Sequence, residues 1–233
     1  MGSERTRFVS FSGIDGAGKS TQIEALRNRL EAAGLSVRTL TFWDDVACFK
    51  GMREHAGHTL FGGDKGVGTP EKPINRRDKN VSSRVMTLIR WGMYFADAVS
   101  LRFAVRRALA SADFLICDRY TWDELANLKL HWWLTRMYVR FIARIVPRPD
   151  VSFVLDADPI LARARKPEYP LDFLYRSRES YLTLSGLVGR ITVVAPGPVG
   201  EVEAAILSHI DCRKPPGSQP NPLVRQAGGG AAA

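Results

Sequence analysis

The feature that most constrains this chain is a glycine-rich loop between an apolar run and an amphipathic stretch. The loop reads GIDGAGKS over residues 13–20 and fits the pattern G-x-x-x-x-G-K-[ST]. The run before it, Phe8–Ser12, predicts a buried strand, and apolar residues recur at helical spacing over Ser20–Ala33. Gly34 is a natural helix stop, and Leu35–Phe42 predicts a second strand. This strand–helix–strand unit indicates a parallel sheet and an α/β fold.

The residue types of the loop suit a polyphosphate ligand. Glycines let backbone N–H groups turn toward an anion, and the helix that follows points its positive end at the same place. Lys19 supplies a point charge for the β- and γ-phosphates, and the Ser20 hydroxyl can ligate Mg²⁺. A match by chance is expected roughly once in a hundred chains of this length. We therefore predict an ATP-binding loop made of Gly13, Ile14, Asp15, Gly16, Ala17, Gly18, Lys19, Ser20 and Thr21.

Further apolar patterns extend the alternation of strands and helices. Short buried runs predict strands over Phe114–Cys117, Val151–Leu155 and Ile191–Val194. Amphipathic stretches predict helices over about Ser82–Ala110, Trp122–Val146, Leu171–Leu184 and Glu201–Ile210. Gly92 is a candidate break in the first of these helices, and Pro147 ends the second. We expect one folded domain over 1–211, with a basic Gly/Pro-rich insert at about 57–80 and a disordered tail over 212–233.

Composition narrows the class of protein. The chain has 233 residues, of which 45% are hydrophobic and 24% are charged, and this excludes a wholly disordered or collagen-like chain. The net charge of +9 favours anionic partners. Cys48, Cys117 and Cys212 have no paired spacing, which argues against a zinc site and fits a reducing compartment. The chain begins without an apolar signal core, and no apolar run reaches 18 residues. We expect a soluble cytoplasmic protein with no membrane partner.

Several segments besides the loop follow one familiar order. Asp118, Arg119 and Tyr120 follow the FLIC strand, a Pro-Asp pair precedes FVLDADPILARAR, and LDFLYRSRESYLTLSG and VVAPGPVGEVEAAI come later. Together with FSGIDGAGKSTQ, these segments resemble the thymidylate kinase family of nucleoside monophosphate kinases. The resemblance is collinear over roughly residues 7–211, and the phosphate loop is its most specific part.

The resemblance implies the P-loop kinase fold, a five-stranded parallel sheet flanked by helices on both faces. It implies transfer of the γ-phosphoryl group of ATP to thymidine monophosphate, with Lys19 at the transferring group. Family members without a basic residue at the position of Gly16 use lid arginines there, and Arg163 and Arg165 match that role. The lid is expected at about 162–172. Such a transfer needs positioning and charge neutralisation more than covalent chemistry.

The resemblance also assigns the metal and acceptor residues. Ser20 and Asp118 would lie at the Mg²⁺ ion, Asp15 would face the acceptor sugar hydroxyl, and Arg119 would bind the acceptor phosphate. Family members are commonly dimers, so a homodimer is implied as well.

The acceptor half departs from the family pattern. Phe42–Asp45 stands where the family has a Glu-Pro-Gly-Gly-type turn. Phe95 keeps an aromatic residue for stacking on the base, but Asp97 or Ala98 replaces the Arg expected after it. Arg53, Arg84 and Arg90 are candidate replacements for the missing acceptor arginine. A P-loop kinase for another acceptor, such as a nucleoside or another metabolite, is therefore the alternative.

A non-enzymatic module that binds nucleotide or nucleic acid is a third hypothesis, but nucleic acid is not the expected partner. Arg136, Arg140 and Arg144 recur every fourth residue, which is typical of a solvated helix face; a patch for nucleic acid or membrane is the alternative.

Overall fold

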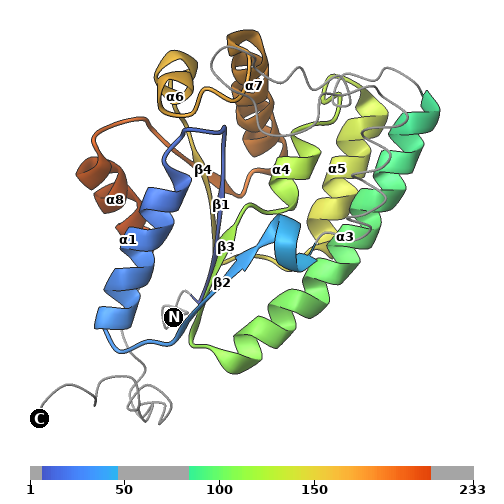
Figure 1. Ribbon diagram of the computed structural model, residues 1–233. Coiled ribbons are helices and arrows are strands. Elements are labelled where there is room, and N and C mark those ends of the chain that lie inside the picture. Colours follow the sequence, from blue (N-terminus) through green and yellow to red (C-terminus); the bar gives the residue numbers. More distant parts are fainter. Residues whose placement is uncertain (1–6, 47–83, 211–233) are drawn as a thin grey trace, which may run out of the picture.

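The computed structural model describes residues 7–46 and 84–210 and has a central five-stranded sheet (Figure 1). The strands are β1 Phe8–Ser12, β2 Val37–Thr41, β3 Phe114–Asp118, β4 Val151–Leu155 and β5 Ile191–Val194. Their order is β2-β3-β1-β4-β5, and all four neighbouring pairs are parallel. The predicted α/β fold with a five-stranded parallel sheet is confirmed.

Helices cover both faces of the sheet. They are α1 Lys19–Ala32, α3 Arg84–Ser111, α4 Thr121–Leu125, α5 Trp133–Ile145, α6 Pro159–Arg165, α7 Leu171–Val188 and α8 Val199–Leu207, with a π-helical turn, η1, at Phe42–Val46. Helices α1 and α8 lie on one face, and α3, α4, α5 and α7 lie on the other (Figure 1). Helix α6 packs on α7 beyond the ends of the strands. None of the helices in these two ranges is long and apolar enough to cross a membrane.

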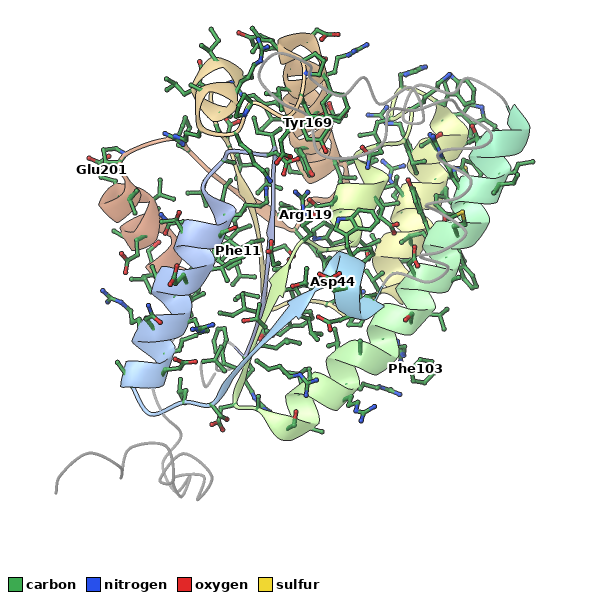
Figure 2. All side chains as sticks on the ribbon, in the orientation of Figure 1. Phe11, Asp44, Phe103, Arg119, Tyr169 and Glu201 are labelled. Carbon is green, nitrogen blue, oxygen red and sulfur yellow. The ribbon has the colours of Figure 1, made fainter. Side chains whose placement is uncertain are left out.

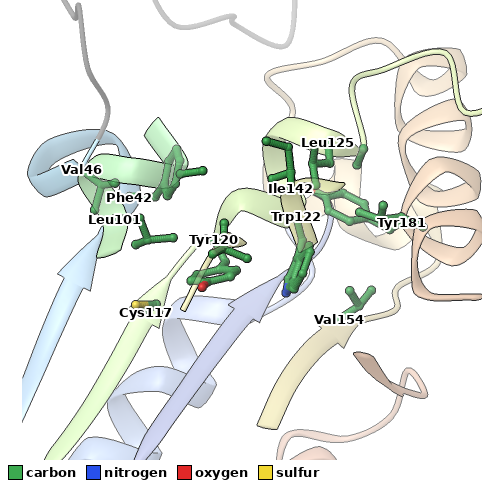
Figure 3. Close-up of a cluster of buried hydrophobic side chains, with 14 of the residues drawn as sticks. Phe42, Val46, Leu101, Cys117, Tyr120, Trp122, Leu125, Ile142, Val154 and Tyr181 are labelled. Atoms are coloured by element: carbon green, nitrogen blue, oxygen red, sulfur yellow. The ribbon is translucent and has the colours of Figure 1, made fainter. Parts of the chain in front are cut away.

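The two faces of the sheet form separate hydrophobic clusters because strand side chains alternate. Val9 and Phe11 of β1 pack toward α1 and α8, where Phe11 stacks on Phe153 with 5.3 Å between ring centroids. Phe8 belongs to the opposite cluster, where its ring lies 6.0 Å from that of Tyr120. Figure 3 shows part of this cluster, with Tyr120, Leu101 of α3, Ile142 of α5 and Tyr181 of α7. Burial on both faces explains why the strands read as continuous apolar runs rather than as alternating ones.

The single helix predicted over Trp122–Val146 is wrong: the chain forms α4 and then α5. Tight backbone hydrogen bonds end α4, from Asn127 N to Glu124 O at 3.0 Å and from Leu128 N to Leu125 O at 3.1 Å. The Asn127 side-chain amide also donates to the carbonyl of Asp123 at 2.7 Å, which competes with the helical pattern. The connecting turn buries Leu128 and so closes the core under α4.

Helix α3, in contrast, continues through Gly92, so the candidate break is not used. Gly92 lies on an exposed part of this helix, where a glycine costs only about 1 kcal/mol relative to alanine. The predicted basic insert at 57–80 and the tail at 212–233 lie outside the described residues.

Candidate active site

The candidate site lies at the carboxyl ends of three neighbouring strands. β1 leads into the glycine-rich loop, β3 ends at Asp118, and β4 ends just before Asp156. The register pairs Phe11 with Asp118, and the backbone N–H of Arg119 donates to Phe11 O at 2.9 Å. The parallel pairing therefore brings together segments more than a hundred residues apart in the sequence. In open parallel sheets, ligands bind outside these carboxyl ends.

Two glycines of the loop occupy conformations that other residues disfavour. Gly13 has φ 138° and Gly16 has φ 83°. A Cβ atom on Gly13 would lie 2.6 Å from Leu155 O, and one on Gly16 would lie 2.2 Å from Ala162 O. The loop is thus held against the end of β4 and against α6, and glycine is required at both positions. Gly18, also with positive φ, is the N-cap of α1.

Lys19 is buried beneath this loop. Its Nζ donates to Gly13 O at 2.8 Å and to Ile14 O at 2.9 Å. Burial, together with the charge of Arg119, lowers the pKa of Lys19 to about 8, although nearby carboxylates act in the opposite sense. Ser20 and Thr21 are exposed on the first turn of α1. The loop therefore presents a helix N-terminus and a lysine that has lost part of its hydration, and both favour an anion.

Arg119 is the second cationic group of the site and has an unusual backbone. It is the only non-glycine residue with positive φ (66°) among those that the structure describes. Its Nη2 donates to Asp15, and its Nη1 donates to Asp123 at 3.3 Å. Figure 2 shows Arg119 in the centre of the molecule. A left-handed residue at the end of a strand indicates that the direction of this side chain is specified at a conformational cost.

The carboxylates beside Arg119 respond to it. Burial by itself raises the pKa of Asp15, but the charges of Arg119 and Lys19 outweigh it, so the pKa of Asp15 is lowered. Burial also lowers the pKa of Arg119, and Asp123 and Asp15 more than offset this, so its pKa is raised. Asp15 is therefore ionised and Arg119 protonated at neutral pH.

Asp123, which the sequence analysis did not single out as a site residue, holds Arg119 in place. It is 3% exposed and accepts hydrogen bonds from Ser12 Oγ at 2.6 Å, Tyr181 Oη at 2.8 Å and Tyr120 N at 3.0 Å, as well as from Arg119. The four-residue spacing between an arginine and an aspartate was the available signal. Only the fold reveals that β1 and α7 supply further donors to this carboxylate.

Asp118 lies half-buried at the end of β3. Burial raises the pKa of Asp118, and the charge of Lys19 opposes that rise only in part. This carboxylate lies near enough to Lys19 and Arg119 for both charges to act on it. Among the residues in the two described ranges, no three His, Cys, Asp or Glu side chains form a group that could hold a metal by themselves.

The segment expected as the lid forms α6 and the start of α7. Asp158 caps α6 by accepting from Ile160 N at 2.7 Å, with Pro159 as its first residue. Arg165 Nη1 donates to Gly16 O at 3.4 Å, so this predicted lid arginine contacts the loop. Arg163 is half-buried on the same short helix.

Two further features border the lid. Arg178 of α7 forms a bidentate pair with Asp156, at 2.6 and 2.7 Å, and ties α7 to the end of β4. Beside the glycine-rich loop lies a cavity of about 390 Å³, whose lining includes Ala17, Leu161 and Arg165. A volume of this size is typical of a small-molecule site.

The predicted acceptor residues are only partly brought together. Asp15 and Arg119 are in contact, whereas Arg53 lies outside the described residues. Phe95 is 43% exposed on α3 and stacks on Phe141 of α5, with 6.2 Å between ring centroids, rather than joining the Arg119 cluster. Asp97, at the position where the arginine was expected, is completely buried.

We compared the sequence with protein-family models and with curated proteins. No protein-family model matches the sequence. The thymidylate kinase of Bifidobacterium longum strain DJO10A is 31% identical over 216 residues, which cover 87% of this chain and 96% of that protein. The thymidylate kinase of Methylococcus capsulatus is 30% identical over 88% of this chain and 95% of its own length. A probable thymidylate kinase of Pyrobaculum calidifontis is 36% identical over 88% of this chain and 95% of its own length.

Proposed function

The chain belongs to the thymidylate kinase family and is a nucleoside monophosphate kinase; from this premise we propose that it transfers the γ-phosphoryl group of ATP to thymidine monophosphate. The observation that carries the proposal is that two cationic groups, Lys19 after the loop that follows β1 and Arg119 at the end of neighbouring β3, both act on Asp15. Arg119 does so by a hydrogen bond and Lys19 by its charge. Two cationic groups so placed suit one phosphate each from a donor and an acceptor. The bond between the γ-phosphorus and ADP breaks, and a bond to an oxygen of the acceptor phosphate forms.

On the donor side, the loop binds the ATP phosphates through its backbone N–H groups and the N-terminus of α1. Lys19 exchanges its hydrogen bonds to Gly13 O and Ile14 O for phosphate oxygens. The neighbouring negative charge raises the pKa of Lys19 from about 8, so the lysine is fully protonated in the complex. The cavity of about 390 Å³ beside Ala17 accommodates the nucleoside part of ATP.

On the acceptor side, Arg119 keeps its bond to Asp123 and turns Nη2 from Asp15 to an oxygen of the acceptor phosphate. Asp15 is then available to accept a hydrogen bond from the acceptor sugar hydroxyl. Because Asp123 is fixed by three other donors, the guanidinium does not need to be reorganised at the moment of transfer.

The lid supplies the remaining positive charge. Arg165 already contacts the loop at Gly16 O, and Arg163 lies one half-turn away on the same helix. Arg165 neutralises charge on the phosphoryl oxygens as the group is transferred, and Arg163 adds positive charge on the same helix.

The Ser20 hydroxyl and the Asp118 carboxylate fit a Mg²⁺ ion at the phosphates. Oxygen ligands from one or two side chains, with the rest from water and phosphate, are the usual arrangement for this ion. When bound, Mg²⁺ neutralises phosphate charge and orients the donor. Ser20 is exposed on the loop side of α1, and the raised pKa of Asp118 indicates a carboxylate that a cation would favour in its charged form.

The proposal is tested by an assay of ADP release with ATP and Mg²⁺, comparing thymidine monophosphate with other nucleoside monophosphates and with thymidine. We expect selective activity with thymidine monophosphate. Lys19→Ala and Arg119→Ala should each lower the rate by at least about 100-fold, whereas Arg106→Ala, on an exposed part of α3, should leave it unchanged. ADP release stimulated only by another acceptor would contradict the substrate, and full activity in both site variants would contradict the assignment of the residues.

We also propose that the protein is a homodimer that pairs through α3 and α5. These two helices carry a continuous exposed apolar face, joined by the Phe95–Phe141 stack. Phe103 points away from the molecule (Figure 2) and is 64% exposed, and Trp133 is 67% exposed. The face comprises Leu88, Ile89, Phe95, Val99, Phe103, Trp133, Leu134, Met137 and Phe141. An apolar face of this extent is uncommon on a monomer and is typical of an interface.

A further inference from the structure

A second cavity lies near the amino end of β4, whereas the proposed kinase site lies at the carboxyl ends of the strands. It has a volume of about 270 Å³, is partly open to solvent, and is bordered by the ends of α5 and α7 and by the segment that leads into β4. β4 begins at Val151 beside this cavity and ends at Leu155 beside the other one. The length of the strand separates the two cavities by roughly 13 Å, so they do not share a ligand.

Among the residues that the structure describes, the lining of the cavity includes four arginines and no acidic residue. The arginines are Arg140, Arg144, Arg148 and Arg190, and all four are exposed. Arg144 Nη1 donates to Arg140 O at 3.2 Å. Among the described residues, Arg140, Arg148 and Arg190 have neither an ion pair nor a hydrogen bond from the guanidinium. The three guanidiniums are therefore available to a ligand.

The helix ends at this cavity do not account for so much charge. The C-termini of α5 and α7 each carry about half a negative charge, so together they offset about one of the four arginines. About three positive charges remain around one opening. Because guanidinium groups match phosphate oxygens in geometry as well as in charge, the ligand that suits this lining is a phosphate compound with several negative charges.

The apolar lining and the volume of the cavity further limit the classes of ligand that it could bind. Trp122, Val146 and Leu187 line the cavity, and Trp122 Nε1 donates to Ser152 Oγ at 3.2 Å. The volume corresponds to roughly nine water molecules, which is more than a single small ion needs and less than a large cofactor requires. The recess is partly open to solvent, and its size fits a short polyphosphate better than the extended backbone of a nucleic acid.

We propose that this cavity binds a di- or triphosphate group, inorganic or carried by a nucleoside, at a site separate from the phosphate loop. Trp122 precedes Asp123, the residue that holds Arg119, so α4 connects the two sites directly. The proposed function does not depend on this second site, and the second site does not depend on the identity of the acceptor.

The test counts bound ligands by equilibrium dialysis of the full chain with inorganic triphosphate at low salt. We expect two molecules per chain, one at the phosphate loop and one at the arginine cavity. The double variant Arg140→Ser/Arg190→Ser should bind one molecule and lose affinity at the second site by about tenfold or more. The matched control Arg106→Ser/Arg136→Ser removes the same charge from exposed positions outside the cavity and should still bind two. Lys19→Ala should keep the molecule that the cavity variant loses.

Repeating the dialysis with ATP distinguishes the two sources of the phosphate group. A second site filled by ATP but not by inorganic triphosphate supports a nucleotide ligand, and filling by both supports the polyphosphate alone. Binding of only one molecule by the native chain with inorganic triphosphate and again with ATP, lost in Lys19→Ala and kept in the cavity variant, would overturn the proposal. So would a single-stranded oligonucleotide that displaces the second triphosphate and binds more tightly than it does.

Discussion

Arg119 shows how a single residue can be fixed from both sides. Its backbone takes a left-handed conformation, and its guanidinium lies between Asp15 and Asp123. The two carboxylates have different surroundings. Asp15 lies half-buried in the glycine-rich loop, whereas Asp123 is buried and accepts hydrogen bonds from other donors. The guanidinium can therefore exchange one partner for a phosphate while the other partner keeps it in position.

Replacement of Asp123 tests this arrangement at the scale of the residue. Asp123→Asn removes the buried charge that faces Arg119, so we expect kcat/KM for the acceptor to fall by about 10- to 100-fold, while the KM for ATP changes little. Steady-state kinetics with each substrate varied in turn measures both values. Asp172→Asn is the matched control because Asp172 forms an exposed ion pair with Arg176 on α7. Equal losses for ATP and acceptor would contradict a positioning role for Asp123.

The pKa of Lys19 predicts how nucleotide binding depends on pH. In the proposed function protonated Lys19 binds phosphate. Its pKa of about 8 in the free protein means that its charge is lost as the pH rises above that value. The affinity for ADP without divalent metal should be nearly constant below about pH 7 and roughly tenfold weaker at about pH 9. Calorimetric titration across this range measures the change.

A variant separates this effect from the titration of other groups. Lys19→Arg retains a charge at all these pH values, so whatever its absolute affinity, the tenfold decrease should disappear. A decrease of the same size in both proteins would assign the pH dependence to another group.

At the scale of the element, the glycine-rich loop and α6 form one unit. Gly16 lies so close to Ala162 O that no side chain fits between them, and Arg165 bonds to the carbonyl of the same glycine. In the proposed function the loop binds the donor and α6 carries the lid arginines. The position of α6 relative to the loop then decides whether the loop and the arginines reach the same phosphate. The capping of α6 by Asp158 and the bidentate Arg178–Asp156 pair hold that position from the other side.

Gly16→Ala should separate these two elements. The added methyl group meets backbone at 2.2 Å and requires a positive φ that alanine disfavours, so either the loop or α6 must shift. We expect kcat to fall by at least about 100-fold with the fold retained, as measured by turnover and circular dichroism. Gly186→Ala, at an exposed position in α7 with open space around it, should retain activity and stabilise the protein by about 0.5–1 kcal/mol. Unchanged turnover in Gly16→Ala would show that the contact with α6 is unimportant.

At the scale of the whole molecule, the two faces of the sheet have different surroundings. On the face that α1 and α8 cover, the apolar side chains of the strands and of these helices pack into one buried cluster. The outer side of α3 and α5, in contrast, is apolar and exposed. Phe95, expected at the acceptor base, is part of that outer face. The proposed homodimer would cover it.

The homodimer predicts a mass in solution of about twice 25.9 kDa by light scattering. Phe103→Glu/Met137→Glu places charges in the middle of the apolar face and should yield monomers, because an unpaired charge is costly to bury in an interface. Arg102→Glu/Arg136→Glu, at exposed positions on the same two helices, is the control and should remain dimeric. A native chain that is monomeric at micromolar concentration would refute the pairing.

Local sequence patterns were enough to predict the five strands, most of the helices and the glycine-rich loop between β1 and α1. These are local properties, because buried parallel strands are short apolar runs and the loop needs specific residue types at fixed spacing. The pattern did not predict that Trp122–Val146 divides into α4 and α5. The hydrogen bond of the Asn127 side chain and the burial of Leu128 end α4 within a stretch whose apolar spacing is otherwise helical.

The contacts between distant side chains become visible only in the folded structure. The parallel register places Arg119 beside Asp15, which lies 104 residues away in the sequence. The packing of α7 places Tyr181 beside Asp123, which lies 58 residues away. In α3, Asp97 lies in the core and Phe95 on the outer face. Arg140, Arg148 and Arg190 line one cavity. Contacts between distant residues depend on how helices pack across a sheet. Hydrophobic spacing along the chain records which face of an element is buried but not which partner it meets.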